Sequence, residues 1–224
     1  MNDGHMKILF ENTVGEEALE LSDKVFTNEN GDSFKVSVFK YYVSNIKLTR
    51  DDETVFTVPE SYHLINQSVS GSAAIELHDV PVGNYKSITF LLGVDSLRNV
   101  SGAQTGALDV MNGMFWGWDT GYIMAKLEGQ YKNQAGAYHS FIYHIGGFKG
   151  LNSSLRWFTL PLPEKAVVSF RTPAIHITAD VSEWFKTPTK IEFAQYNNIM
   201  EPGRGMNVLV DNYMDMFTVS HVVN

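Results

Sequence analysis

The chain has 224 residues, of which 44% are hydrophobic and 19% charged, a composition typical of a globular protein with a hydrophobic core. Its net charge of -8 argues against nucleic acid as a partner, because binding to phosphates needs a basic surface. It contains no cysteine, which excludes disulfides, thiolate metal ligands and a thiol nucleophile. It also lacks the run of about 20 apolar residues that a membrane helix needs.

Short β-rich runs separated by Gly, Pro and Asn dominate the sequence, which predicts an all-β fold. Residues 1–6 have no apolar signal core and are predicted to be an added leader, so the domain is expected over residues 7–224. Because no repeat or linker divides that range, we expect a single domain. The predicted strands are Lys7–Thr13, Phe34–Arg50, Thr54–Val58, Tyr62–Asn66, Ala73–Leu77, Tyr85–Leu92, Tyr122–Glu128, Ala137–Ile145, Leu155–Leu160, Ala166–Phe170 and Ala174–Thr178.

The long predicted strand Phe34–Arg50 changes phase along its length. Val36 and Val38 fall on one face of the strand, whereas Phe39 and Tyr41 fall on the other. Such a change indicates a β-bulge or a strand that is covered on both faces. Many closely spaced strands together predict an antiparallel β-sandwich with long Gly-rich loops.

Helical signals are few. Val181–Phe185 is predicted to form one helical turn with Asp180 as its N-cap. Met206–Phe217 carries apolar residues at helical spacing, which predicts one short C-terminal helix. The segment from Asp95 to Gly121 lacks a convincing strand, and its glycines and short polar side chains favour an ordered loop held by local hydrogen bonds.

The chain has seven histidines, a residue type that commonly binds metals. His5 is discounted with the leader, and for any single histidine a surface or structural role is the expected one. His139 and His144 are an odd number of residues apart on one strand, so they face opposite sides of a sheet. A metal site must therefore combine separate strands. His63 and His144 are the pair to examine, since two neutral imidazoles suit copper or zinc.

Trp116 and Trp118 are separated by one glycine in the run Met114–Tyr122. They are expected to plug one end of the sandwich, and a stacking surface for a sugar or peptide is the second interpretation. An intact indole does not ligate a metal, because its ring nitrogen only donates a hydrogen bond. Oxidation to kynurenine would supply an aryl amine with a lone pair.

Little in the sequence favours an enzyme. It contains no Gly-x-Ser-x-Gly, kinase or P-loop signature, and a hydrolase is the weakest interpretation. Glu128 and Asp95 are candidates for a carboxylate pair, but each lies next to a strand-end glycine, which favours a structural hydrogen-bonding role.

Seven short motifs follow one another along nearly the whole chain: Lys40–Leu48, Pro81–Tyr85, Gly93–Ser96, Gly106–Asp109, Met114–Tyr122, Lys126–Gly129 and Tyr143–Gly146. In this order they resemble the MbnP-like copper-binding family, the methanobactin-associated periplasmic protein type. The resemblance implies an extracytoplasmic β-sandwich without a membrane span. Such proteins are exported, in some bacteria with a lipid anchor, by a signal segment that this sequence lacks.

The resemblance also implies a non-enzymatic protein that holds one copper, as Cu(I), through two histidines and a kynurenine made from tryptophan. Carried over to this sequence, His63 and His144 are the imidazole ligands, and Trp116 or Trp118 is the kynurenine precursor. A di-haem enzyme of the peroxidase type is the implied partner for this oxidation. A Trp-x-His arrangement known in a relative is absent, since Thr120 follows Trp118 two places on.

Two functions therefore stay open. The first is copper binding or handling in the cell envelope. The second is a structural or organic-ligand-binding envelope lipoprotein that keeps the fold without the copper site. The positions of His63 and His144 distinguish them, because the two imidazoles share an ion only when they lie within about 5 Å of each other.

Overall fold

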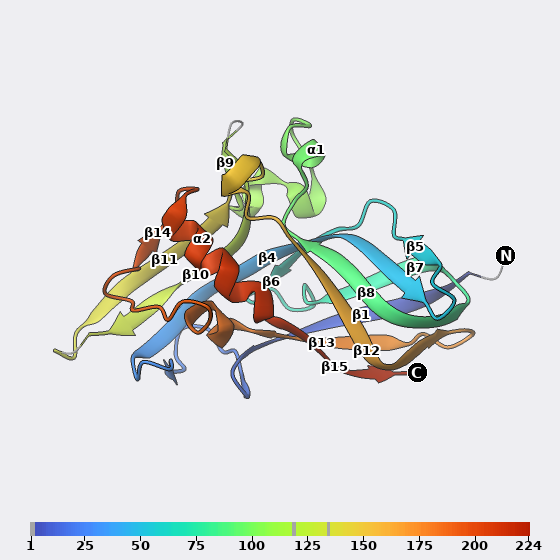
Figure 1. The fold of residues 1–224 in the computed structure, drawn as a ribbon, viewed down its shortest axis with the longest axis horizontal. Coiled ribbons are helices and arrows are strands. Elements are labelled where there is room, and N and C mark those ends of the chain that lie inside the picture. Colours follow the sequence, from blue (N-terminus) through green and yellow to red (C-terminus); the bar gives the residue numbers. More distant parts are fainter. Residues whose placement is uncertain (1–2, 118–119, 134) are drawn as a thin grey trace.

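The computed structural model describes residues 3–117, 120–133 and 135–224, and strands make up most of it (Figure 1). The strands are β1 (Asp3–Val14), β2 (Glu17–Ala18), β3 (Phe26–Thr27), β4 (Ser33–Arg50), β5 (Val55–Thr57), β6 (Tyr62–Asn66), β7 (Ala74–Pro81), β8 (Gly83–Leu92), β9 (Phe115–Gly117), β10 (Gly121–Lys132), β11 (Tyr138–Gly146), β12 (Arg156–Val168), β13 (Ala174–Asp180), β14 (Asn198–Ile199) and β15 (Phe217–Val223). The α-helices are α1 (Ser96–Asn99) and α2 (Arg204–Asn212), and the 3-10 turns are η1 (Gly106–Leu108), η2 (Val110–Asn112), η3 (Gly150–Asn152), η4 (Val181–Phe185) and η5 (Tyr213–Asp215).

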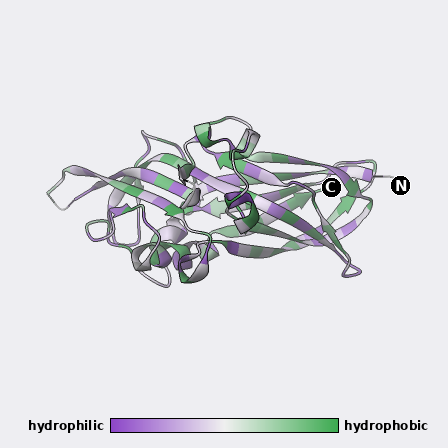
Figure 2. Ribbon diagram, turned by 90° about the horizontal axis from the view of Figure 1, so that it is seen from above, coloured by the Kyte–Doolittle hydropathy of each residue, from purple (hydrophilic) through white to green (hydrophobic). Residues whose placement is uncertain are grey.

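Within the described residues, two open sheets face each other across the main hydrophobic core. The larger sheet has the order β12-β8-β4-β10-β11-β14, with β3, β5, β6 and β9 paired along it. The smaller sheet has the order β15-β13-β1-β2, and β7 also pairs with β1. Apolar and polar residues alternate along many strands, as the bands of Figure 2 show. The predicted all-β sandwich is confirmed, although β1 and β13 run parallel.

Strand β4 is the axis of the larger sheet, and two strands share one of its edges. Tyr41 pairs with residues of β6 and β10, whereas Val43 pairs with residues of β6 and β8. Strand β6 therefore occupies one edge of β4, while β8 and β10 follow each other along the opposite edge. Between β8 and β10 the chain leaves this edge and crosses the outer face of the sheet.

The predicted phase change in β4 is confirmed. Between β4 and β10 the pairing shifts register and skips Ser37, which is the extra residue of a bulge. Farther along the strand, residues 41–44 are buried on both faces. The main core covers one face here, and a second apolar cluster that includes Tyr42 covers the other.

The chain that leaves β8 forms an ordered cap over the outer face of the larger sheet, and we call residues 93–117 the cap segment. It carries α1, η1, η2 and β9, and it contributes Val94 and Met114 to the second apolar cluster. The Asp95 carboxylate accepts hydrogen bonds from Tyr62 (2.5 Å), Asn45 (3.0 Å) and two backbone N–H groups of α1. The prediction of an ordered loop held by local hydrogen bonds is confirmed for residues 95–114, whereas residues 115–117 form the strand β9, which was not expected. Asp95 has its expected structural role.

Helical turns, rather than strands, cover the inner face of the larger sheet near β10 and β11. The turn η4 forms as predicted, with the Asp180 side chain accepting a hydrogen bond from the N–H of Ser182. Helix α2 confirms the predicted C-terminal helix only as far as Asn212. The chain then makes the turn η5 and enters β15 at Phe217, so the predicted end of this helix was wrong.

Strand β1 begins at Asp3, inside the segment predicted to be a leader. Met6 is fully buried in the main core and pairs with Leu77 of β7. The first strand therefore starts earlier than the predicted Lys7, and residues 3–6 are part of the smaller sheet. In the part of the chain that the structure describes, the helices are too short or too polar to cross a membrane.

Candidate metal site on the outer face of the larger sheet

His144 lies on β11, on the face of the larger sheet that points away from the main core. Its neighbours Tyr143 and Ile145 are buried in the main core, so the alternation of the strand places His144 on the opposite face. Its cross-strand partner on β10 is Lys126. The side chain of His144 is only 15% exposed. This combination makes His144 a partly enclosed imidazole on the outer face.

The Glu128 carboxylate orients this imidazole, with its Oε1 atom 2.7 Å from His144 Nε2. An ionised carboxylate only accepts hydrogen bonds, so Nε2 carries the proton and Nδ1 keeps its lone pair. In the part of the chain that the structure describes, no hydrogen bond to His144 Nδ1 is found. A histidine whose second nitrogen is held by a carboxylate is a common arrangement for a metal ligand.

Burial lowers the pKa of His144 below its ordinary value. The hydrogen bond to Glu128 acts in the opposite direction, and the positive charge of Lys126 reinforces the lowering. Burial outweighs the carboxylate, so the imidazole is neutral at neutral pH. Only a neutral imidazole has the free lone pair that a metal ligand needs.

A close backbone contact places Glu128. The next residue, Gly129, follows the bulge and packs so tightly that a Cβ atom there would overlap the backbone oxygen of Lys35 and the ring of Phe141. The position therefore requires glycine, which gives a physical reason for the Lys126–Gly129 motif.

The cap segment covers the site, and three side chains connect it to the sheet: two lysines of the sheet and one tryptophan of the cap segment. Lys126 Nζ donates to the backbone oxygen of Gly113 (2.6 Å), and Lys40 Nζ donates to that of Asn112 (3.2 Å). The ring of Trp116 lies against Gly146, where a Cβ atom would overlap it. Since Gly146 is two residues beyond His144 on the same face of β11, the structure brings Trp116 and His144 to one region.

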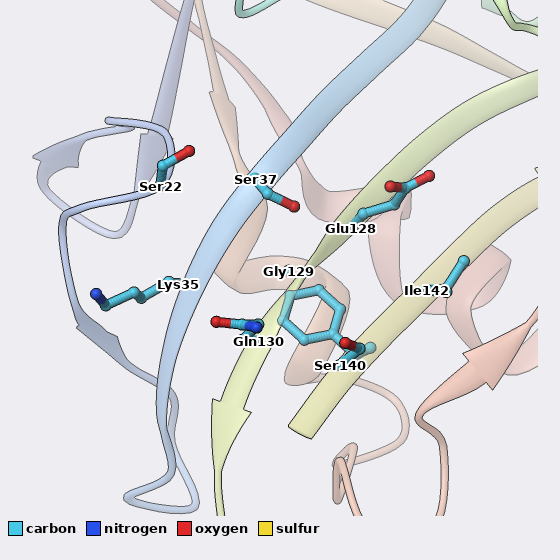
Figure 3. A pocket seen from close by; sticks show the side chains of 9 residues that line it. Ser22, Lys35, Ser37, Glu128, Gly129, Gln130, Ser140 and Ile142 are labelled. Atoms are coloured by element: carbon cyan, nitrogen blue, oxygen red, sulfur yellow. The ribbon is translucent and has the colours of Figure 1, made fainter. Parts of the chain in front are cut away.

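A polar groove continues from Glu128 along the outer face, and Figure 3 shows its side chains rising from β4, β10 and β11. It encloses about 360 Å³. Its lining includes the bulge residue Ser37 and also Lys35, Gln130 and Ser140. Glu128 therefore belongs both to this groove and to the His144 site.

His63 lies elsewhere. On β6 it pairs with Val43 of the main core, whereas its neighbours Tyr62 and Leu64 pack against the second apolar cluster. The His63 side chain therefore points inward, where it lines a pocket together with residues of β7. Burial lowers the pKa of His63.

The predicted pairing of His63 with His144 is therefore not formed. The two residues are on opposite faces of the larger sheet, and the pairings β6-β4-β10-β11 put three strand spacings between them, about 14 Å. Two nitrogens that bind one ion are only about 4 Å apart at most. Sequence spacing did not reveal this, because the faces are set by register. Trp118, the other predicted kynurenine precursor, lies outside the described residues.

The two-histidine ligand set thus does not fit this structure, whereas a single oriented imidazole does. Within residues 3–117, 120–133 and 135–224, no group of three or more His, Asp or Glu side chains is arranged to hold a metal ion. Trp116 in its unmodified form adds no lone pair. Sequence analysis missed the role of Glu128, although its even spacing from Lys126 on a shared strand already placed it on the same face as that lysine.

The fold and the site define a two-sheet β-sandwich protein with a capped outer face, on which a carboxylate orients His144. The chain belongs to the MbnP family, whose model matches residues 3–201. It is similar to the solved structure of MbnP from Methylosinus trichosporium, with 12% identity, a TM-score of 0.61, and coverage of 98% of this chain and 99% of that chain. At this identity the likeness shows the fold alone. No curated protein matches the chain. The resemblance carried by the seven motifs is confirmed.

Proposed function

We propose that this protein is a non-enzymatic, extracytoplasmic metal-binding protein that binds copper through His144. The protein would lie in the periplasm or, as an exported lipoprotein, on the outer surface of the cell. The observation that carries this proposal is the contact between His144 Nε2 and Glu128 Oε1, which leaves Nδ1 free to bind a metal. Membership of the MbnP family supports it.

The charges around His144 favour Cu(I) over a divalent ion. Lys40 and Lys126 lie in the same row of the sheet as His144, and Glu128 is the nearest carboxylate. Two nearby ammonium groups repel a divalent ion about twice as strongly as a monovalent one. An imidazole ligand also binds copper more favourably than it binds a hard cation.

Trp116 is proposed as the source of a further ligand. Its ring lies against Gly146 on the face that carries His144, and it packs beside both apolar clusters. Oxidation of this indole to kynurenine by a di-haem enzyme of the peroxidase type would add an aryl amine near the imidazole. Mass spectrometry of protein from its native source tests this step, by looking for a gained oxygen and a lost carbon at Trp116 or Trp118.

Copper titration under reducing conditions, by competition with a chromogenic Cu(I) chelator, tests the proposal. We expect His144→Ala to weaken Cu(I) binding by at least about tenfold, the lower end of the effect of removing even an outer partner of a metal site. The matched control is His63→Ala, which also removes a partly buried imidazole of the larger sheet but should leave the affinity unchanged. Equal affinity of the wild-type and His144→Ala proteins would contradict the proposal.

The groove beside Glu128 favours a second candidate, binding of a small organic ligand in a protein that keeps the fold without copper. Lys35, Gln130 and Ser140 present one cationic group and several hydrogen-bonding groups to about 360 Å³ of space. A screen of small organic acids by ligand-observed NMR tests it. Binding that is lost in Lys35→Ala and kept in His144→Ala would favour this candidate over copper.

A further inference from the structure

A pair of histidines faces each other on the outer side of the smaller sheet, which both sheets separate from His144. His5 is on β1 and His78 is on the neighbouring strand β7. Their Nδ1 atoms are 3.1 Å apart. The ring planes are nearly perpendicular, at 80°, with centroids 5.1 Å apart. Both side chains are exposed, whereas Met6 and Leu77 beside them are buried.

A bulge creates this pairing. Gly4 pairs with Val80 and Met6 with Leu77, so the single residue His5 stands opposite two residues of β7, His78 and Asp79. Asp79 adopts a left-handed backbone conformation, with φ of 55°, that accommodates the extra residue. The bulge turns the His78 ring toward His5. Sequence alone does not reveal the pair, because the two histidines are 73 positions apart.

The distance between the two nitrogens matches that of two ligands on one ion. Two nitrogens at about 2.0–2.1 Å from a metal are about 2.9 Å apart at a right angle and about 3.3 Å apart at the tetrahedral angle. The observed 3.1 Å lies between these values. In the absence of an ion, one Nδ1 atom must carry a proton, since two lone pairs facing each other repel.

The surroundings of the pair favour a cation. Glu76 is on the same face of β7, two residues before His78, and it forms an ion pair with Lys7 at 3.1 Å. The hydrogen bond and charge of Lys7 lower the pKa of Glu76, which therefore stays ionised. The carboxylate of Glu76 therefore offsets the positive charge of Lys7 beside the pair. A shallow pocket lined by His5, Glu76, His78 and Thr172 leaves room for water on the remaining positions of an ion.

We propose that His5 and His78 form a binding site for a divalent transition-metal ion of the borderline class, Zn(II), Ni(II) or Cu(II), through their Nδ1 atoms. Water completes the coordination. The ion joins β1 to β7, and binding therefore stabilises the folded chain by mass action. This site is independent of the copper proposal for His144, since it uses different residues on the other sheet.

A second histidine pair on the same sheet supplies the control. The rings of His176 and His221 are stacked, with centroids 4.0 Å apart and 21° between planes. Their Nδ1 atoms already have partners, Glu11 for His176 (2.7 Å) and Ser220 for His221 (3.0 Å). Each of these two nitrogens thus contacts a residue outside the pair, unlike the Nδ1 atoms of His5 and His78, which contact each other.

Calorimetric titration with ZnSO4 at neutral pH tests the site, using His144→Ala as the parent protein so that the His144 site does not contribute. We expect one Zn(II) per chain in the parent and a loss of at least about tenfold in affinity in both His5→Ala and His78→Ala. His176→Ala should bind as the parent does. Circular dichroism checks that each exposed substitution leaves the fold intact.

A further readout makes the outcome specific. In NMR spectra of the imidazole nitrogens, Zn(II) should shift the Nδ1 signals of His5 and His78. Unchanged Zn(II) affinity in either His5→Ala or His78→Ala would overturn the proposal. So would Nδ1 shifts confined to other histidines.

Discussion

His144 on the outer face of the larger sheet and the His5–His78 pair on the outer face of the smaller sheet are held in opposite ways. On the larger sheet, the cap segment covers the face, and a single imidazole, His144, is partly enclosed and held by Glu128 at 2.7 Å. On the smaller sheet no such cover is seen in the described residues, and His5 and His78 meet in solvent at 3.1 Å. Burial keeps the ring of His144 neutral and Glu128 selects its tautomer, whereas the register between β1 and β7 brings the exposed rings of His5 and His78 together.

Because of this difference, the His144 site and the His5–His78 site favour different ions. An enclosed neutral imidazole beside two lysines favours a monovalent soft ion, while an open pair beside the carboxylate of Glu76 favours a divalent one. The two faces also depend on different parts of the chain. The first needs the cap segment and the close packing at Gly129 and Gly146, and the second needs only the bulge between β1 and β7.

The largest expected effect is that of Gly129→Ala, which should damage the larger sheet and spare the smaller one. The added methyl group would overlap the backbone oxygen of Lys35 and the ring of Phe141, so β10 must shift relative to β4. We expect a loss of about 3 kcal/mol in the free energy of unfolding, at the upper end of the usual cost of overpacking. Urea denaturation measures it, and the folded protein should keep its Zn(II) affinity at His5 and His78.

Gly205→Ala is the matched control for this glycine substitution. Gly205 lies in α2, and an added Cβ atom there meets no other atom within 4 Å. Because alanine favours helix more than glycine does, the control should gain up to about 1 kcal/mol. If Gly129→Ala is as stable as the wild type, the close approach of β10 to β4 does not hold Glu128 in place.

An intermediate effect is expected for Glu128→Gln, which removes the charge that holds the imidazole of His144. The amide still bonds to Nε2 but no longer selects the Nε2–H form, because glutamine both donates and accepts. We expect a loss of about 10–100-fold in Cu(I) affinity, the usual cost of losing an outer partner of a metal-binding histidine. Competition titration against a Cu(I) chelator measures this loss.

The same substitution should lower the pKa of His144 further, because the Glu128 carboxylate acts to raise it while burial lowers it. NMR titration of the imidazole checks the direction. Glu16→Gln, at an exposed turn, is the matched control for the lost charge and should change neither property. A rise in the pKa of His144 would contradict the assigned role of Glu128.

The sequence predicted a strand or turn correctly where the residues of that element themselves determine it, through their apolar spacing or a capping residue. Strand β6 has the predicted bounds, and the bulge in β4 follows from the phase of its apolar residues. The turn η4 follows from Asp180 as its cap. Strand β15 was missed because Phe217 also continues the helical spacing of α2, and the choice between the two depends on β13 as a pairing partner.

The sites were harder to predict, because they depend on register between strands that are distant in sequence. His63 and His144 both occupy apolar strands, yet the pairings of β4 place them on opposite faces. His5 and His78 meet through a bulge that no local motif marks. The period of two in a strand predicts which residues share a face of that strand, but it carries no information about the neighbouring strand.

The smallest effect concerns the pH dependence of stability, and it tests whether enclosure keeps a histidine neutral. Burial lowers the pKa of both His63 and His144, so between about pH 6.5 and the folded pKa the unfolded chain binds more protons and stability falls as pH falls. Each histidine contributes a slope of at most about 1.4 kcal/mol per pH unit, and neither contributes above pH 7. His63→Gln should flatten the profile more than His144→Gln, because burial alone acts at His63 while Glu128 opposes it at His144. Urea denaturation across this pH range measures both slopes. Profiles parallel to the wild type in both variants would mean that enclosure by the sandwich and the cap segment does not set these protonation states.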